Sequence, residues 1–150
     1  MPLVRGVLLV PNKFYTLKGY ALLEANVITT SMEDYLEMAY RLHTSGQPIR
    51  NKTIASNLNV KPSSATKMVA NLKKHGLAMS ERYGYIQLTP AGLALGEYLI
   101  FRHDTLHRLL CFINQSTNEL EQVEKIEHFV NVDTVMNIQR LLDTLQAEIK

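Results

Sequence analysis

The sequence predicts a mostly α-helical protein with one small β-hairpin, on three observations. Apolar residues recur at helical spacing through most of residues 31–149, and Ser, Thr or Pro begins several of these segments. Two short strand-like runs flank Tyr83-Gly84, which is a hairpin signal. The hairpin follows two short helical segments, so we expect a winged helix-turn-helix followed by an all-helical region.

The first clear helical segment begins within "TTSMEDYLE". Thr30 with Glu33, or Ser31 with Asp34, fits a capping box, and the apolar pattern stops before Gly46. Residues 1–30 form an N-terminal extension of unknown role. Within it, residues 17–26 fit a short helix and residues 3–10 fit a strand or an ordered arm.

Two short helices joined by a tight connection follow. The first covers about Asn51–Leu58, and Asn59–Lys61 connects it to a second helix that opens at Pro62 and ends at Gly76. With the hairpin, these residues predict a winged helix-turn-helix DNA-binding domain over residues 31–90.

A helical region completes the chain. Thr89 and Pro90 begin a long helix to about Ile113, whose apolar face is longer than a monomer of this size needs. Two more helices are expected at about Thr117–Val130, with Ser116 and Glu119 as a capping box, and at about Asp133–Ile149. We therefore assign residues 91–150 to a helical dimerisation and metal-binding domain, and we expect a homodimer.

Charge is distributed unevenly, although the net charge is only +2. Residues 48–82 contain seven Lys or Arg against one acid, for a local charge of +6. Residues 115–150 contain seven acids against three bases, for a local charge of −4. A basic middle and an acidic end indicate two separate roles.

Cysteine content and hydropathy bear on the location of the protein. The single cysteine, Cys111, excludes an intrachain disulfide and a cysteine-based zinc knuckle, and it fits a reducing cytoplasm. The apolar run Val7–Val10 is too short for a membrane span or a signal-peptide core. We expect a cytoplasmic protein with no membrane partner.

The basic middle fits a surface that binds double-stranded DNA. Lys-rich helix faces are usually only solvated, but here the turn, the proline at the helix start, the hairpin and the local charge agree with one another. The second helix would face the major groove, with its neighbours at the phosphates. The residues expected at DNA are Lys52, Lys61, Ser63, Ser64, Thr66, Lys67, Lys73 and Arg82.

Acidic and histidine residues recur on three other helical segments. Each pair alone has a simpler explanation as a capping group, a solvated face or a partly buried histidine. Their order in the chain is more specific, because "SMEDYLE", "VKPSSATKMV", "LTPAG", "FRH" and "VEKIEH" occur at characteristic separations. In these motifs, which span Ser31 to about Leu145, the chain resembles the iron- and manganese-dependent repressors, the DtxR/MntR family. It is too short for the SH3-like domain of the iron-type members and looks like the compact manganese type.

The resemblance implies a metal site that can hold two ions with a bridging glutamate. Asp34 stands where iron-type members have Met, and Glu124 where they have Cys; His107 is not part of the manganese-type pattern and is an accessory ligand at best. The ligands implied are Asp34, Glu37, His103, Glu124, Glu127 and His128.

The donor chemistry agrees with this resemblance. Four carboxylates and two imidazoles without a thiolate favour Mn²⁺ or Fe²⁺ in a roughly octahedral shell over tetrahedral zinc. Metal would hold the DNA-reading helices and the dimer body in one orientation on an inverted-repeat operator. We expect a repressor of metal-uptake genes.

Two other classes remain as alternatives. One is a winged-helix regulator that senses a small organic ligand, with the acids merely solvated. The other is a metallohydrolase that uses the same carboxylates on a bound water. The sequence shows no positioned nucleophile and no Gly-rich phosphate loop, so we expect no enzyme activity.

Overall fold

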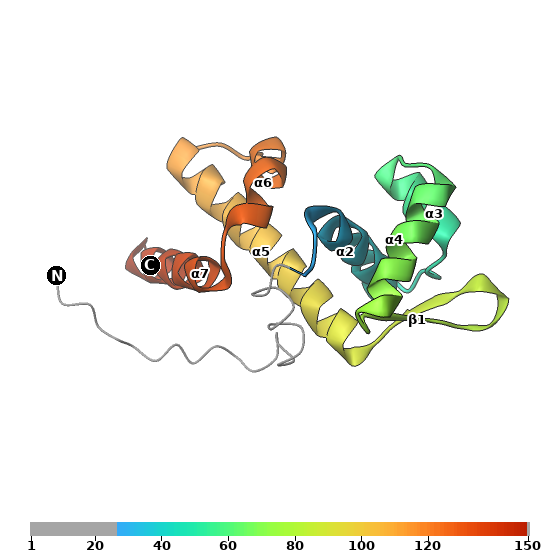
Figure 1. Ribbon diagram of the computed structural model, residues 1–150. Helices are drawn as coiled ribbons and strands as arrows, with labels where there is room; N and C mark the ends of the chain where they lie inside the picture. Colours follow the sequence, from blue (N-terminus) through green and yellow to red (C-terminus); the bar gives the residue numbers. More distant parts are fainter. Residues whose placement is uncertain (1–26, 150) are drawn as a thin grey trace.

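The computed structural model describes residues 27–149, which form six α-helices and one two-stranded sheet (Figure 1). The predicted helix and strand within residues 1–26 lie outside this range. No helix within residues 27–149 has an apolar stretch of the length that a bilayer crossing needs.

The first half of the described chain is a winged helix-turn-helix, as the sequence predicts. Three helices and a hairpin form it: α2 (Thr30–Thr44), α3 (Asn51–Leu58), α4 (Pro62–Lys74), β1 (Ala78–Ser80) and β2 (Ile86–Leu88). Asn59 connects α3 to α4 in the left-handed conformation, with φ of 54°. The strands pair antiparallel with Met79 opposite Gln87, and residues 82–84 form the tip of the wing. We call α2, α3, α4 and the wing the head.

The start of α2 differs from the predicted capping box. Thr29 is the N-cap, and its hydroxyl accepts a hydrogen bond from the Met32 backbone at 3.2 Å. Neither Thr30 nor Ser31 caps the helix. The Glu33 carboxylate, a predicted capping partner, instead pairs with buried Arg102 at 2.8 Å. A charge-assisted bond to a buried cation is stronger than a bond to a helix-end amide, which accounts for the difference.

Helix α5 (Pro90–Asn114) connects the two halves of the molecule. The Thr89 hydroxyl accepts from the Gly92 backbone at 3.1 Å and donates to the Gly76 carbonyl at 2.6 Å, which ties the helix to the end of α4. Gly92 lies against the Leu77 carbonyl so closely that a methyl group would collide with it. The "LTPAG" segment is therefore the joint that fixes the direction of α5 against the wing.

Helix α6 (Leu120–Ile126) is shorter than the predicted Thr117–Val130 segment. Ser116 makes no capping box, because its hydroxyl donates to the Glu119 carboxylate at 2.7 Å. Glu119 is the N-cap without a side-chain cap bond, and its backbone N–H donates to His107 Nε2. At the other end, residues 127–129 continue as a 3₁₀ turn, η2 (Glu127–Phe129).

The last helix, α7 (Val132–Ile149), starts one residue before its predicted position. The main apolar core lies between α2, α3, α4 and the first half of α5, and Val135 and Met136 of α7 join it. A second, smaller cluster of Leu106, Leu110 and Val123 lies between α5 and α6. We call the second half of α5 with α6, η2 and α7 the body. Head and body therefore meet along α5 (Figure 1).

Candidate metal-binding cleft and DNA-reading surface

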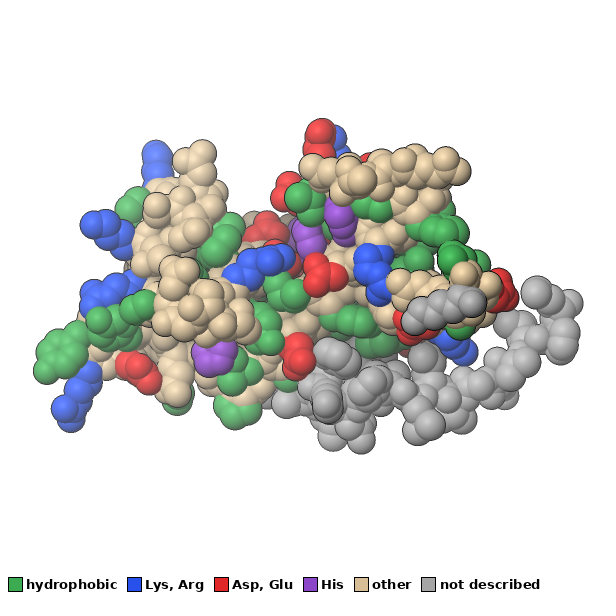
Figure 2. Space-filling view, turned by 180° about the vertical axis from the view of Figure 1, so that it is seen from behind, with side chains coloured by type: hydrophobic (Ala, Val, Ile, Leu, Met, Phe, Trp, Pro, Cys, Tyr) green, Lys and Arg blue, Asp and Glu red, His purple; other side chains and the backbone are tan. Residues whose placement is uncertain are grey.

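The head exposes all eight residues predicted at DNA, and Lys and Arg side chains project from it in Figure 2. The Pro62 start and the buried Ala65, Val69 and Leu72 fix which face of α4 packs inward. The opposite face, which carries Lys67, is solvent-exposed. Within residues 27–149, none of the five cations in the predicted set forms an ion pair. They are therefore available to phosphates.

The hydroxyl of Thr66 is already engaged, because it donates to the Pro62 carbonyl at 3.0 Å and lies 3.4 Å from the Asn51 amide. These bonds join the start of α3 to the first turn of α4. Of the predicted set, Thr66 thus has a structural role beside any contact to DNA.

A cation that sequence reasoning missed lies against the wing. The Arg50 guanidinium stacks 4.0 Å from the centroid of the Tyr85 ring, which holds it beside the start of α3. Arg50 lay within the basic stretch, but nothing in the local pattern indicated that its partner would come from the wing.

A cleft of about 560 Å³ separates head from body, and all six predicted metal ligands line it. Figure 2 shows it as a hollow between the two lobes, where histidine and acidic side chains gather. Helix α2 supplies Asp34 and Glu37 from the head. The body supplies His103 from α5 and the remaining three ligands from α6 and η2: Glu124, Glu127 and His128.

Five of these residues form two overlapping donor groups. Asp34, Glu127 and His128 make one group, and Glu37, His103 and Glu127 make the other. Within each group the donor atoms all lie within 4.8 Å of one another. Buried Glu127 belongs to both groups, so one carboxylate faces two clusters of ligands.

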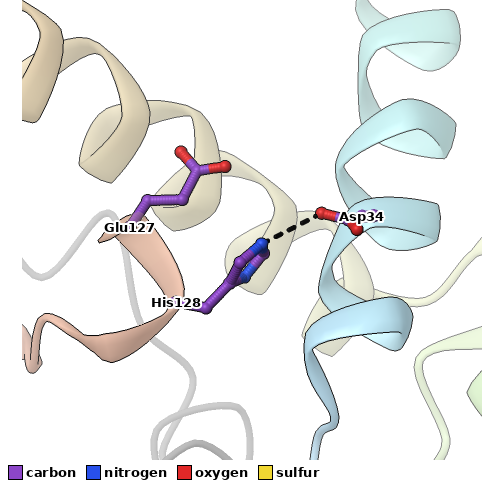
Figure 3. Close-up of side chains that lie close together, drawn as sticks. All are labelled: Asp34, Glu127 and His128. Carbon is purple, nitrogen blue, oxygen red and sulfur yellow. Dashed lines mark ion pairs between the residues drawn. The ribbon is translucent and has the colours of Figure 1, made fainter. Parts of the chain in front are cut away.

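Short contacts hold the members of these groups together, one across the cleft and one within the body. His128 points from η2 toward α2, with its Nε2 at 3.2 Å from Asp34 Oδ1 (Figure 3). His103 Nδ1 lies 2.8 Å from Glu127 Oε2. The contact between His128 of the body and Asp34 of the head is one that the sequence alone does not predict.

Two predicted residues stand apart from these groups. Glu124 lines the cleft but is exposed and belongs to neither group. His107 faces away from this set: its Nε2 accepts from the Glu119 backbone at 3.2 Å and lies 3.5 Å from Cys111 Sγ. The first contact ties His107 to the start of α6, and the second lies within α5.

The electrostatics of the cleft favour a cation. Burial raises the pKa of the Asp34 carboxyl, His128 opposes that shift, and the charge of Glu127 adds to it. Burial also raises the pKa of Glu37, against the effect of Arg41. The hydrogen bond from His103 to Glu127 raises the pKa of that imidazole. Burial and neighbouring negative charges disfavour the ionised form of these carboxyl groups, and a bound cation would stabilise that form.

Two buried residues behind the cleft were missed by sequence reasoning. Glu33 looked like a capping group, and Arg102 is one letter of the "FRH" motif. Both are buried, and they pair with each other behind His128. A charged residue at a position that the apolar pattern predicts to be buried indicates a buried ion pair. The sequence does not show which residue is its partner, because Glu33 and Arg102 lie far apart in the chain.

Fold and site together define a winged-helix DNA-binding regulator with a metal-type donor set between its lobes. A family profile described as "Iron dependent repressor, N-terminal DNA binding domain" matches residues 27–86. The HTH-type transcriptional regulator MntR of Geobacillus kaustophilus is 37% identical over 121 residues, covering 80% of this chain and 86% of that protein. MntR of Shouchella clausii is 39% identical over 119 residues, covering 79% and 83%.

Solved structures agree with these relatives. The manganese regulator SloR aligns with a TM-score of 0.67 at 27% identity, and ScaR with bound Zn²⁺ with a TM-score of 0.65 at 32% identity. Each alignment covers 75% of this chain and 53% of the other, so the chain spans about half the length of those structures. The chain belongs to the DtxR/MntR-like family of metal-dependent transcriptional repressors. This membership disfavours a winged-helix sensor of small organic molecules.

Proposed function

We propose that this chain represses metal-uptake genes by binding operator DNA when Mn²⁺, or Fe²⁺, occupies the cleft. The observation that carries the proposal is the position of Glu127, shared by two donor groups at the junction of head and body. The proposed ligands are the six residues that line the cleft, and the sharing of Glu127 supports two ions for each subunit.

The nature of the donors supports a hard divalent ion. Oxygen outnumbers nitrogen among the six, and the only described cysteine, Cys111, bonds to His107 outside the cleft. A bound cation supplies the positive charge that offsets the repulsion between the clustered carboxylates. Asp34 and Glu37 hold the head side of the site, and His103, Glu127 and His128 hold the body side. These residues would therefore fix the angle between the two lobes.

The DNA contacts are proposed for the head. Lys61, Ser63, Ser64 and Lys67 stand at the start of α4, where a recognition helix meets base edges in the major groove. The flanking cations, Lys52, Lys73 and Arg82, would contact phosphates on either side, with Thr66 between them.

A homodimer would present two heads to one operator. Support comes from apolar side chains that the single chain leaves exposed on the body: Phe112 and Ile113 on α5, and Leu141 on α7, each at least 50% exposed. A twofold dimer predicts an inverted repeat whose half-sites lie about one helical turn apart, or a multiple of it. Binding to chromosomal operators requires that the protein act in the cytoplasm.

The direct test is fluorescence anisotropy with a labelled duplex from the upstream region of a manganese-uptake gene. We expect tight binding in Mn²⁺ and weak, salt-sensitive binding in EDTA. A duplex of scrambled sequence is the control for non-specific binding. Equal affinity for both duplexes in both buffers would contradict the proposal.

A further inference from the structure

A buried network of Glu33, Arg102 and His128 lies behind the cleft. Glu33 is 6% exposed and Arg102 is 3% exposed. Arg102 Nη2 lies 2.8 Å from Glu33 Oε2, and Nη1 lies 3.5 Å from Oε1. His128 Nδ1 lies 2.5 Å from the same Oε2 atom, so one carboxylate oxygen holds both groups.

The proton on His128 can be assigned from these distances. Nδ1 has two neighbours, Glu33 Oε2 at 2.5 Å and Arg102 Nη2 at 3.4 Å. A guanidinium only donates, so Nδ1 would have to accept from Arg102 through a long contact or donate to Glu33 through a short one. The short bond to a carboxylate is the stronger. Nδ1 therefore carries a hydrogen, and it is Nε2 that faces Asp34 in the cleft.

Packing alone does not explain why these charges are buried. Within residues 27–149, Arg102 Nε has no hydrogen-bond partner, and the second Arg102–Glu33 contact is long. A buried ion pair with imperfect satisfaction costs desolvation and is often no more stable than apolar residues of the same size. The arrangement is better explained by its contact with His128, because the ion pair holds the imidazole of His128 toward the donor group that includes Asp34 and Glu127.

We propose that Glu33 is a positioning residue for the metal site, which fixes the His128 ring so that Nε2 is the nitrogen offered to the ion. The inference rests on the metal site proposed above. Glu33 is not itself a ligand, because Arg102 and His128 occupy its one shared oxygen and it does not line the cleft. Metal-binding histidines are commonly held through their other nitrogen in this way.

The network also joins the two lobes. Glu33 precedes the proposed ligand Asp34 on α2, whereas Arg102 and His128 belong to the body. A rotation of α2 relative to the body would move Glu33 and Asp34 together, and both contact the His128 ring. The orientation of this ligand therefore depends on the position of the head before any ion binds.

The test compares Mn²⁺ affinity of Glu33→Gln with that of wild type, by electron paramagnetic resonance of free Mn²⁺. The amide is isosteric but uncharged, so it holds the imidazole less firmly, and we expect affinity to fall about 10- to 100-fold. Glu121→Gln, at an exposed residue that pairs with Lys125, is the matched control and should leave affinity unchanged. Equal affinity in Glu33→Gln and wild type would overturn the inference while leaving the site intact. Failure of wild type to bind Mn²⁺ would instead overturn the proposed function.

A measurement on the wild type alone covers the case in which Glu33→Gln does not fold. Long-range proton–nitrogen NMR on protein loaded with diamagnetic Zn²⁺ or Cd²⁺ reports which His128 nitrogen binds the ion. We expect the metal on Nε2 and a retained hydrogen on Nδ1. Metal on Nδ1, or an Nδ1 without hydrogen, would overturn the inference.

Discussion

The DNA-reading surface and the acidic cleft are assembled in different ways. The exposed cations of the reading surface come from residues 52–82 and stand on consecutive elements of the head. The proposed ligands in the cleft range from residue 34 to residue 128, on α2, α5, α6 and η2. One surface is local in the chain and the other exists only when head and body pack together. Metal binding can therefore report on that packing, whereas the charges of the reading surface alone cannot.

The largest effect is expected for Glu127→Ala. This change removes the carboxylate shared by both donor groups and the partner of His103. Because even residues behind metal ligands contribute 10- to 100-fold, Mn²⁺ affinity should fall by at least about 100-fold, and the metal response of DNA binding should vanish. Calorimetry measures the Mn²⁺ affinity, and circular dichroism checks that the variant is folded. Glu121→Ala is the control. A retained Mn²⁺ response would mean that the cleft is not the metal site.

A change of metal preference is expected for Glu124→Cys. The substitution exchanges an oxygen donor at the cleft for a soft thiolate, which favours Fe²⁺, Co²⁺ or Zn²⁺ over Mn²⁺. Activation of operator binding across a metal series should shift in that direction, by about tenfold in the ratio of zinc to manganese. Wild type, which keeps Cys111 outside the cleft, controls for thiol effects. An unchanged ranking would show that Glu124 does not select the ion.

Acid should weaken metal binding. Burial raises the pKa of Asp34 and Glu37, and the bond to Glu127 raises that of His103, so these groups keep protons at higher pH than free side chains do. A cation must displace such protons, so Mn²⁺ affinity should fall as the pH falls, by up to about tenfold per unit for each proton released. Calorimetry in buffers of different ionisation heat counts the protons. The pKa of His103 is raised from an ordinary value of 6.5, so affinity that is flat between pH 8 and 6 would contradict the role of His103 in the site.

The sequence predicts the reading surface better than the cleft, because the residues of the reading surface are close together in the chain and those of the cleft are not. The bounds of α3, the start of α4 and the exposed cations follow from local signals: the tight connection at Asn59–Lys61, Pro62 at a helix start, and a hairpin at Tyr83-Gly84. Helix α4 ends at Lys74, two residues before the predicted end at Gly76. The contact of His128 with Asp34 joins residues far apart in the chain and is not visible in any window. The family resemblance brought the six cleft residues together, and local periodicity alone did not.

The two errors in helix capping have different origins. Glu33 looks like a capping residue, but its carboxylate pairs with Arg102, which lies far away in the chain. Glu119 is engaged locally instead, because its carboxylate accepts from Ser116 and Asn114. A pairing across the fold therefore overrides the capping preference of Glu33, whereas nearby side chains do so at Glu119.

The smallest effect is expected for Lys67→Ala. One exposed lysine on the outer face of α4 should contribute about 1 kcal/mol to operator binding, or about fivefold in affinity. The slope of log K against log salt should shrink by about 0.9 if the lysine neutralises one phosphate. Lys125→Ala, on the body, is the control. Mn²⁺ affinity should be unchanged in both variants, and a loss in Lys67→Ala would show that the two surfaces are not separable.

The central claim is that the cleft and the reading surface are thermodynamically coupled, and linkage tests it most directly. Operator affinity is measured with and without Mn²⁺, and Mn²⁺ affinity with and without operator duplex. Reciprocity requires that the two ratios be equal. We predict that each ligand tightens the other by the same factor, of about 10-fold or more. Mn²⁺ that binds equally well to free and DNA-bound protein would contradict the account, since the ion would then sit in the cleft without controlling the head.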